Sequence, residues 1–386
     1  MAQRLATATV LLLAVVLCAQ PGASATLVGP AGAGQTAPTP QAEPSGPQGP
    51  LSLWTAAQLA EPAEAARAKA ERAIRNLARP DESPPARTAP RVCLPPLPEA
   101  RRGIIRRVAL PEGDRRVALT FDLCERAVHV TGYDARLVDA LRAGRAKATF
   151  FAGGKWLRSH PERALQLLAD PSFELGTHTW THANMAVAPQ AERTRQVDWT
   201  NAQLEILRDE LDRRLRLCGL AACGLGPPTL FRLPYGRGGE GEARFLNERG
   251  LAVIQWDVVG EAGGGSAQAR AEAIAAVLRP GSIVLLHANA MPKDTAEVLR
   301  RLLPLLAAKG LATATVSELL AAGRPELVAS GYFCTPGDNA LYDTRFAGFG
   351  TGGRQKATAH GAALISKGGM SKRGKGGALG KLKHRI

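Results

Sequence analysis

Short apolar runs alternate with amphipathic segments through the middle of this 386-residue chain. The runs are rich in β-branched or aromatic residues and are bounded by Gly, Pro or charged residues, which is typical of buried strands. Seven runs fit this description: 117–121, 146–152, 173–176, 229–232, 252–257, 282–286 and 311–315. Between them, leucines recur with helical spacing, as in Leu204, Leu207 and Leu211. Alternating strands and helices predict an α/β fold with parallel strands, either a (β/α) barrel or a related fold.

The first 25 residues have the pattern of an export signal. A single early charge, Arg4, precedes the apolar run Val10–Leu17 and the small residues Ala23-Ser24-Ala25. This pattern predicts cleavage after Ala25 and export to the periplasm, the exterior or the cell envelope. The run is too short to predict a membrane span, so none is expected once the signal is removed. Lipidation at Cys18 is a minor alternative.

The segments on either side of the alternating region have a different composition. Residues 26–102 are rich in Pro, Ala and Gly and predict a spacer, with a helix within 51–76 that Pro62 interrupts. The catalytic domain is predicted at 103–346. Residues 347–386 form a Gly- and Lys-rich stretch that we expect to be disordered.

Basic residues account for the formal net charge of +15, and nine of them lie in 351–386, which contains no Asp or Glu. Such a tail is expected either to associate with an anionic envelope polymer or to remain a solvated extension. Export argues against a specific nucleic-acid partner.

Five cysteines remain if the signal is removed: Cys93, Cys124, Cys218, Cys223 and Cys334. An odd number in an exported chain implies a free thiol or an intermolecular partner. Cys218 and Cys223 are the pair most easily joined, and a reduced, buried pair is the equal alternative.

Ionisable residues follow five of the predicted strands. The carboxyl ends of parallel strands share one face of a barrel, where active sites form. Two of these residues are histidines four positions apart, which suits a zinc-like ion. The residues that share this position are Asp122, His178, His182, Arg232, Tyr235, Asp257 and His287.

These residues occur in five ordered motifs that resemble those of the polysaccharide deacetylases, the NodB-homology or carbohydrate esterase family 4 enzymes. The resemblance covers about residues 117–320. It implies a distorted (β/α) barrel of about seven parallel strands and metal-dependent removal of acetyl groups from sugars. The motifs are Leu119-Thr120-Phe121-Asp122, His178-Thr179-Trp180-Thr181-His182, Arg232-Leu233-Pro234-Tyr235-Gly236, Trp256-Asp257 and Leu285-Leu286-His287.

The resemblance implies a divalent metal on His178 and His182, most simply zinc, with cobalt or nickel as alternatives. The family has a second Asp directly after the catalytic base, and this Asp is its third metal ligand. Here the position is Leu123, which cannot bind a metal. Glu125 on the same loop is the expected substitute. Cys124 is a softer alternative, and Asp122 or a water could also complete the site.

The resemblance also assigns the remaining chemistry. Asp122 is the base, Arg232 pairs with it and orients it, and His287 is the acid for the leaving amine. The Tyr235 N–H donates to the oxyanion. Asp257 is expected to supply a supporting carboxylate, in contact with Arg232, with His287 or with neither.

Trp256 and Leu286 are expected to line a slot for the acetyl methyl group, although Leu286 could equally be a core residue. The sequence therefore predicts an exported, metal-dependent hydrolase of N-acetylated glycans such as peptidoglycan. Two alternatives are a catalytically impaired barrel that binds envelope glycan, because of Leu123, and an O-acetyl esterase.

Overall fold

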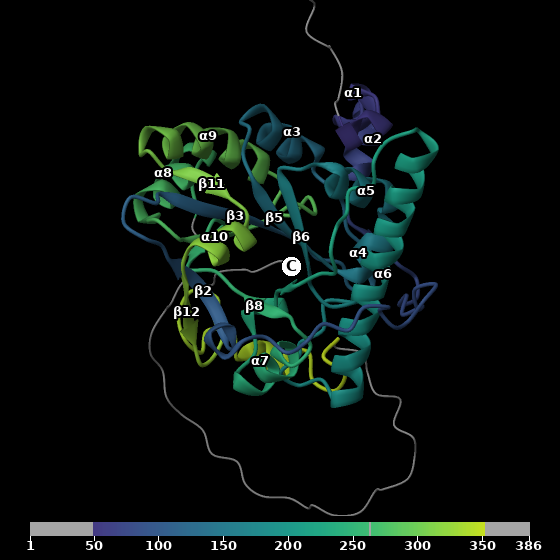
Figure 1. Ribbon diagram of the computed structural model, residues 1–386, viewed down its shortest axis with the longest axis vertical. Coiled ribbons are helices and arrows are strands. Elements are labelled where there is room, and N and C mark those ends of the chain that lie inside the picture. The colour runs from purple at the N-terminus through teal and green to yellow at the C-terminus, as the bar shows by residue number, and fades with distance from the viewer. Residues whose placement is uncertain (1–48, 262–263, 352–386) are drawn as a thin grey trace, which may run out of the picture. The chain divides into compact units, whose positions relative to one another are not determined.

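The computed structural model describes residues 49–261 and 264–351 (Figure 1). Its main element is a ten-stranded sheet with the order β12-β2-β8-β7-β6-β5-β3-β10-β9, in which β11 also pairs with β3. All pairs are parallel except β12 with β2. The α/β fold with parallel strands is therefore confirmed.

The strands of this sheet include one for each of the seven predicted runs, together with β2, β9 and β12. Their bounds are β2 (Ile104–Ala109), β3 (Arg116–Leu123), β5 (Ala148–Ala152), β6 (Phe173–Thr177), β7 (Leu230–Phe231), β8 (Ala252–Ile254), β9 (Val258–Val259), β10 (Ile283–His287), β11 (Ala312–Ala314) and β12 (Arg324–Val328). A separate two-stranded sheet pairs β1 (Arg75–Asn76) with β4 (His129–Val130).

Helices follow most strands and cover the outside of the sheet (Figure 1). The α-helices are α1 (Ala56–Leu59), α2 (Ala65–Glu71), α3 (Ala135–Ala143), α4 (Gly154–Ser159), α5 (Pro161–Ala169), α6 (Gln190–Leu217), α7 (Glu240–Asn247), α8 (Ala267–Val277), α9 (Thr295–Ala308), α10 (Val316–Ala322) and α11 (Leu341–Arg345). The 3₁₀ turns are η1 (Gly49–Leu53), η2 (Glu99–Arg101) and η3 (Pro234–Gly236).

The sheet curls back towards its own start. An isolated antiparallel bridge joins Arg107 on β2 to Ser282, just before β10. The Val108 N–H donates to the Gly281 carbonyl at 3.1 Å beside this bridge. The curl turns one face of the sheet inward and leaves the other face for the helices.

The alternation of side chains along β3 shows the two faces. Leu119, Phe121 and Leu123 join the large outer core beneath the helices. Ala118 belongs to a second, inner core with Phe151 and Trp256. Because successive strand residues point to opposite faces, Asp122 lies on the inner side of the sheet. The orientation of the first motif therefore follows from its place on the strand.

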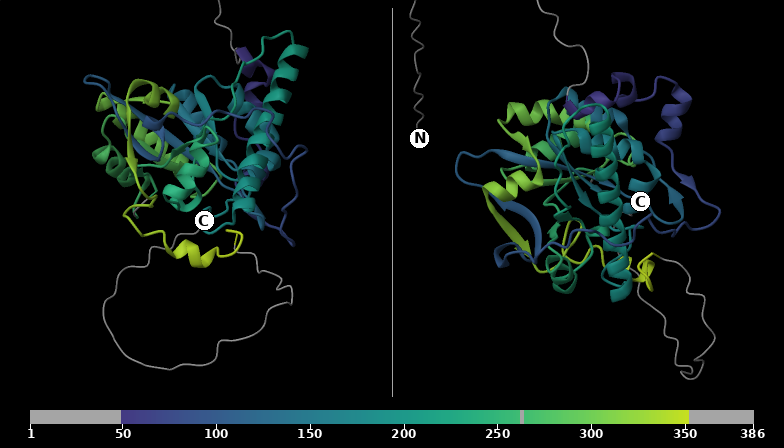
Figure 2. Two further views of the ribbon diagram at one scale, coloured as in Figure 1. Left: turned by 60° about the horizontal axis from the view of Figure 1, so that its bottom comes forward. Right: turned by 45° about the vertical axis from the view of Figure 1, so that its right-hand side comes forward.

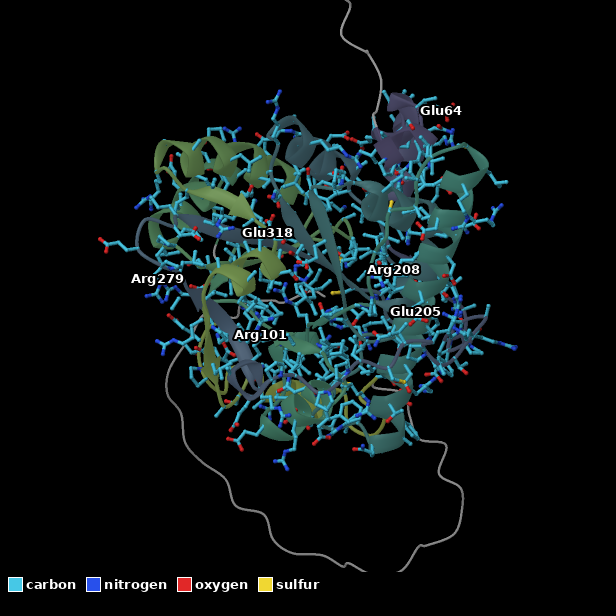
Figure 3. All side chains as sticks on the ribbon, viewed as in Figure 1. Glu64, Arg101, Glu205, Arg208, Arg279 and Glu318 are labelled. Atoms are coloured by element: carbon cyan, nitrogen blue, oxygen red, sulfur yellow. The ribbon has the colours of Figure 1, made fainter. Side chains whose placement is uncertain are left out.

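Residues 49–102, expected to form a spacer, pack against α5 and α6. Helices α1 and α2 flank Pro62, where the sequence predicted an interruption. Arg163 on α5 forms an ion pair with Glu71 at 2.5 Å, and Arg87 forms one with Glu205 of α6 at 2.6 Å. Figure 3 shows Glu205 on this helix. These contacts tie the segment to the outer side of the sheet.

Several predictions concern residues that lie outside the described part of the chain. The signal peptide, cleavage site and basic tail are among them. None of the described helices has the length and apolarity to cross a membrane. Cys218 and Cys223, both described, are not joined to each other.

Candidate active site

Asp122 and His287 lie side by side at the carboxyl ends of two central strands. His287, the last residue of β10, is in register with Asp122 of β3. His178 follows β6 directly, and Arg232 follows β7. Four strand ends therefore deliver these side chains to one edge of the sheet, as the sequence predicted from their positions.

Arg232 holds Asp122 in place through a buried ion pair. The Arg232 Nη1 donates to Asp122 Oδ1 at 2.9 Å, and the Arg232 side chain is fully buried. Its Nε donates to the Ile254 carbonyl at 3.1 Å, and its guanidinium lies 4.0 Å from the centre of the Phe151 ring. Burial lowers the pKa of Arg232, and the Asp122 charge counters this effect. The pair fixes the orientation of the carboxylate.

The two motif histidines face one another with ring centres 4.8 Å apart. His178 Nδ1 is 2.8 Å from the Arg232 carbonyl oxygen, so Nδ1 carries the proton and Nε2 is left with a lone pair. That Nε2 lies 3.6 Å from Asp122 Oδ2. Burial lowers the pKa of His182, whereas Asp122 and Cys124 outweigh burial and raise the pKa of His178.

Unsatisfied nitrogens mark this pair as a binding site. His178 Nε2 and His182 Nδ1 are buried and have no hydrogen-bond partner among the described residues. Buried polar atoms are usually paired, so these two nitrogens are free to act as ligand atoms. Backbone strain is concentrated here as well, because Thr179, His182 and Tyr235 have φ values of 60°, 58° and 61°.

The structure brings Cys124, and not Glu125, to the two histidines. Ligand atoms of Cys124, His178 and His182 lie within 4.8 Å of one another, and those of Cys124, Asp122 and His287 do so too. Burial raises the pKa of the Cys124 thiol, but His182 and His178 outweigh it and lower this pKa well below its usual value.

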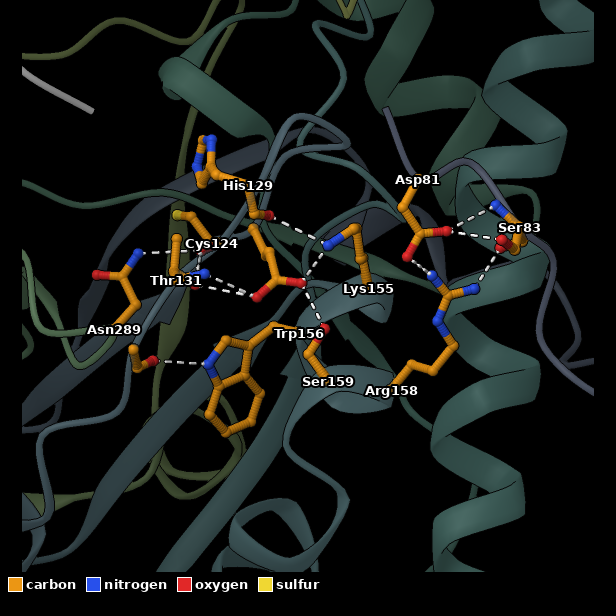
Figure 4. Close-up of polar contacts among 12 residues, drawn as sticks. Asp81, Ser83, Cys124, His129, Thr131, Lys155, Trp156, Arg158, Ser159 and Asn289 are labelled. Atoms are coloured by element: carbon orange, nitrogen blue, oxygen red, sulfur yellow. Dashed lines mark hydrogen bonds and ion pairs between the residues drawn. The ribbon is translucent and has the colours of Figure 1, made fainter. Parts of the chain in front are cut away.

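The expectation that Glu125 is a metal ligand is corrected by its surroundings. Its carboxylate accepts from Lys155 Nζ at 2.6 Å, from Ser159 Oγ at 2.6 Å and from the Thr131 N–H at 2.9 Å (Figure 4). The side chains of Glu125 and Lys155 are both fully buried. Lys155 and Ser159 hold one carboxylate oxygen and Thr131 holds the other, so the group is committed to these partners and not to an ion at the histidines.

Glu261 is a site residue that the sequence did not predict. Its Oε2 lies 2.6 Å from His287 Nδ1, and its Oε1 accepts from the His287 N–H at 2.9 Å. Asp257, for which contact with Arg232, with His287 or with neither was left open, forms no hydrogen bond or ion pair with either residue. It accepts instead from Ser282 Oγ at 2.9 Å and from the Ile283 N–H at 2.8 Å, so it holds the start of β10.

The part of the chain that holds these strand ends is similar to proteins of known class. The sequence profile of the family described as polysaccharide deacetylase matches residues 109–254. That segment holds the first three motifs with Asp122, both histidines and Arg232. Residues 109–254 belong to the polysaccharide deacetylase family. The expected enzyme class is thereby confirmed at the level of the family.

The alignments with curated relatives are longer than this segment. A peptidoglycan-N-acetylglucosamine deacetylase of Bacillus cereus is 27% identical over 216 residues, which are 54% of this chain and 70% of the relative. A chitooligosaccharide deacetylase of Sinorhizobium fredii is 28% identical over 210 residues, which are 51% of this chain and 88% of the relative. A solved structure, of a family 4 carbohydrate esterase from Streptomyces lividans in complex with acetate, is 25% identical, with a TM-score of 0.43, and the match covers 57% of this chain and 99% of that one.

The two residues expected to line an acetyl pocket lie on opposite faces of the deacetylase sheet. Trp256 belongs to the inner core, and its Nε1 donates to the Phe333 carbonyl at 2.9 Å. Its ring centre is 5.4 Å from the Arg232 guanidinium carbon, so it lies close to the site. Leu286 is fully buried in the outer core, because it precedes the inward-facing His287 by one residue. It is therefore a core residue.

An aromatic cluster covers one side of the site. The Tyr235 ring lies 4.4 Å from the His182 ring and stacks on Tyr342 and Phe346, each with a centroid distance of 4.6 Å. Asp343 holds this segment through an ion pair with Arg237 at 2.5 Å. Helix α11, yellow in Figure 2, thus extends the site beyond the five motifs.

We expect Glu261→Gln to move the pH profile of the deacetylase. Burial lowers the pKa of His287, but the Glu261 charge outweighs it and raises this pKa well above its usual value. An acid acts only while protonated, so activity should fall as the pH rises through the pKa of His287. The neutral amide of the variant lacks the charge that stabilises the imidazolium, so this fall should occur at lower pH. The measurement is kcat/KM for acetate release against pH.

The exposed Glu297→Gln on α9 is the matched control and should leave the profile unchanged. A Glu261→Gln enzyme whose alkaline limb coincides with that of wild type would show that Glu261 does not set the pKa of the acid.

Proposed function

We propose that this chain is an exported, metal-dependent hydrolase that removes acetyl groups from N-acetylated sugars of a polysaccharide or peptidoglycan. The observation that carries the proposal is the convergence of an oriented carboxylate, an oriented imidazole and two unsatisfied histidine nitrogens at one edge of the sheet. The names of the curated relatives support a glycan substrate. Export rests on the N-terminal sequence alone, and the basic tail is proposed to bind anionic envelope polymer.

The donor set fits a divalent cation such as zinc, because each of the two imidazoles has a buried nitrogen without a hydrogen-bond partner among the described residues. When bound at His178 and His182, such an ion would polarise the acetyl carbonyl and lower the pKa of a water to about 7. The protein's own groups perform the remaining steps.

Asp122 accepts the proton of the attacking water, and the hydrogen bond from Arg232 keeps its carboxylate aimed during this transfer. The Tyr235 N–H, in the turn η3, donates to the oxyanion of the tetrahedral intermediate. His287, with Nδ1 held by Glu261, presents Nε2 to the leaving nitrogen and donates its proton. The carbon–nitrogen bond then breaks, which releases acetate and a free amine.

Acetate release from paired substrates tests the proposal. Wild-type chain is incubated with N-acetylated chito-oligosaccharides, peptidoglycan fragments and an O-acetylated sugar, and the products are identified by mass spectrometry. We expect free amines from at least one N-acetylated glycan, and none with His287→Ala. Acetate from the O-acetyl sugar alone would replace the proposal with an O-acetyl esterase. Glycan binding without any acetate would favour the impaired barrel.

A further inference from the structure

The loop after β3 places a thiol where the deacetylase site needs a third ligand. Asp122 faces the inner side of the sheet and Leu123 the outer core. Cys124 follows the last residue of β3, and its ligand atom lies within 4.8 Å of those of His178 and His182. A side chain that can bind a metal, Cys124, therefore directly follows Leu123, which cannot bind one.

The backbone around Cys124 is held firmly. Its carbonyl accepts from Thr131 Oγ1 at 2.8 Å and from Asn289 Nδ2 at 3.0 Å (Figure 4). The next residue, Glu125, is fixed by its buried ion pair with Lys155. Cys124 itself is 3% exposed, so its thiol cannot turn outward to solvent without moving this network.

The groups around the Cys124 thiol are suited to binding a cation. Its Sγ shares a 4.8 Å cluster with nitrogens of His178 and His182. His178 Nε2 and His182 Nδ1 are buried and unpaired within the described residues. Cys124 forms no disulfide with any described cysteine. One sulfur and two imidazoles are a ligand set suited to a catalytic zinc site, with a further position open to water or substrate.

We propose that Cys124 is the third metal ligand of this site, which makes it a Cys-His-His centre. The inference rests on the proposed metal dependence and specifies the ligand that the sequence left open. A thiolate is a soft ligand, so the centre should prefer zinc or cobalt to magnesium or calcium.

Cobalt spectroscopy tests the ligand without relying on activity. The full chain is stripped of metal and titrated with Co²⁺. Wild type should develop a thiolate-to-cobalt charge-transfer band in the near ultraviolet that saturates at one equivalent. Cys124→Ser should lack the band and bind Co²⁺ at least about tenfold more weakly, since even the loss of an outer-shell partner has about that effect. Cys124→Asp should regain Co²⁺ binding without the band.

Cys334→Ser is the matched control, because Cys334 is exposed and should not affect the band. Far-ultraviolet circular dichroism of each variant establishes that it is folded. A band that persists in Cys124→Ser, or Co²⁺ binding by wild type without any band, would overturn the proposal. So would chelator-resistant turnover with acetyl trapped on Cys124, because that thiol would then be a nucleophile.

Acetate release is measured on the same samples and separates this inference from the proposed function. A charge-transfer band with no acetate release from any substrate would support Cys124 as a metal ligand and contradict the proposed deacetylase function. Full acetate release by Cys124→Ser, with metal still bound, would support the proposed function and exclude Cys124 as a metal ligand.

Discussion

Replacing Asp122 with asparagine should lower kcat/KM for acetate release by about 10²- to 10⁴-fold, the usual contribution of a general base. Asparagine has nearly the same shape, and its carbonyl can still accept from Arg232 Nη1, which donates to Asp122 at 2.9 Å. The variant should therefore fold and keep its metal. It loses the basic oxygen that takes the proton from water, so the loss should appear in kcat.

Asp114→Asn is the matched control for this prediction. Asp114 pairs with Arg116 at the opposite end of the same strand, at 2.5 Å and partly exposed. Its replacement should leave kcat/KM unchanged, because Asp114 lies at the end of β3 away from the site and a surface pair contributes little even to stability. An Asp122→Asn enzyme with near wild-type kcat would exclude Asp122 as the base.

Lys155→Met should lower the free energy of unfolding by about 3–5 kcal/mol, the usual effect of removing one partner of a buried pair. The Glu125 carboxylate would remain fully buried, with its charge opposed only by hydrogen bonds from Ser159 and Thr131. Unfolding in urea, with the midpoint and slope compared between variants, measures this change.

Two further variants sharpen this test. The double variant Glu125→Gln/Lys155→Met carries no buried charge and should recover much of the lost stability. Lys147→Met removes an exposed pair with Glu318 and should change stability by less than about 1 kcal/mol. A Lys155→Met protein as stable as the Lys147→Met protein would show that the buried pair is not needed to hold the loop after β3.

The sequence was sufficient to predict the sheet and the catalytic edge because both depend on strong local signals. Buried parallel strands are continuous apolar runs, and each catalytic side chain lies at the end of such a run. The sequence alone was therefore enough to place Asp122, Arg232 and His287 together. The strands β2 and β12 were missed because both carry charged side chains, with β12 at the sheet edge and partly exposed.

The third ligand was harder to predict. The negative charge of a carboxylate suggested Glu125, whereas the positions of the side chains favour Cys124. The sequence gives one signal for Cys124: it directly follows β3 and lies two positions after Asp122, in a strand whose side chains alternate between the two faces. The partner of Glu125 could not be seen, because Lys155 is thirty positions away on α4. Glu261 and α11 were missed for the same reason: their contacts with His287 and Tyr235 are tertiary.

Metal-dependent acetate release is the central claim, and one titration tests it most directly. Full chain stripped of metal is incubated with the N-acetylated glycan on which wild type is most active, and Zn²⁺ is added in steps up to several equivalents. Acetate release should be absent at the start and should rise to a plateau at one Zn²⁺ per chain, with His178→Ala inactive throughout. Undiminished acetate release by the metal-free chain, or by His178→Ala, would contradict the account.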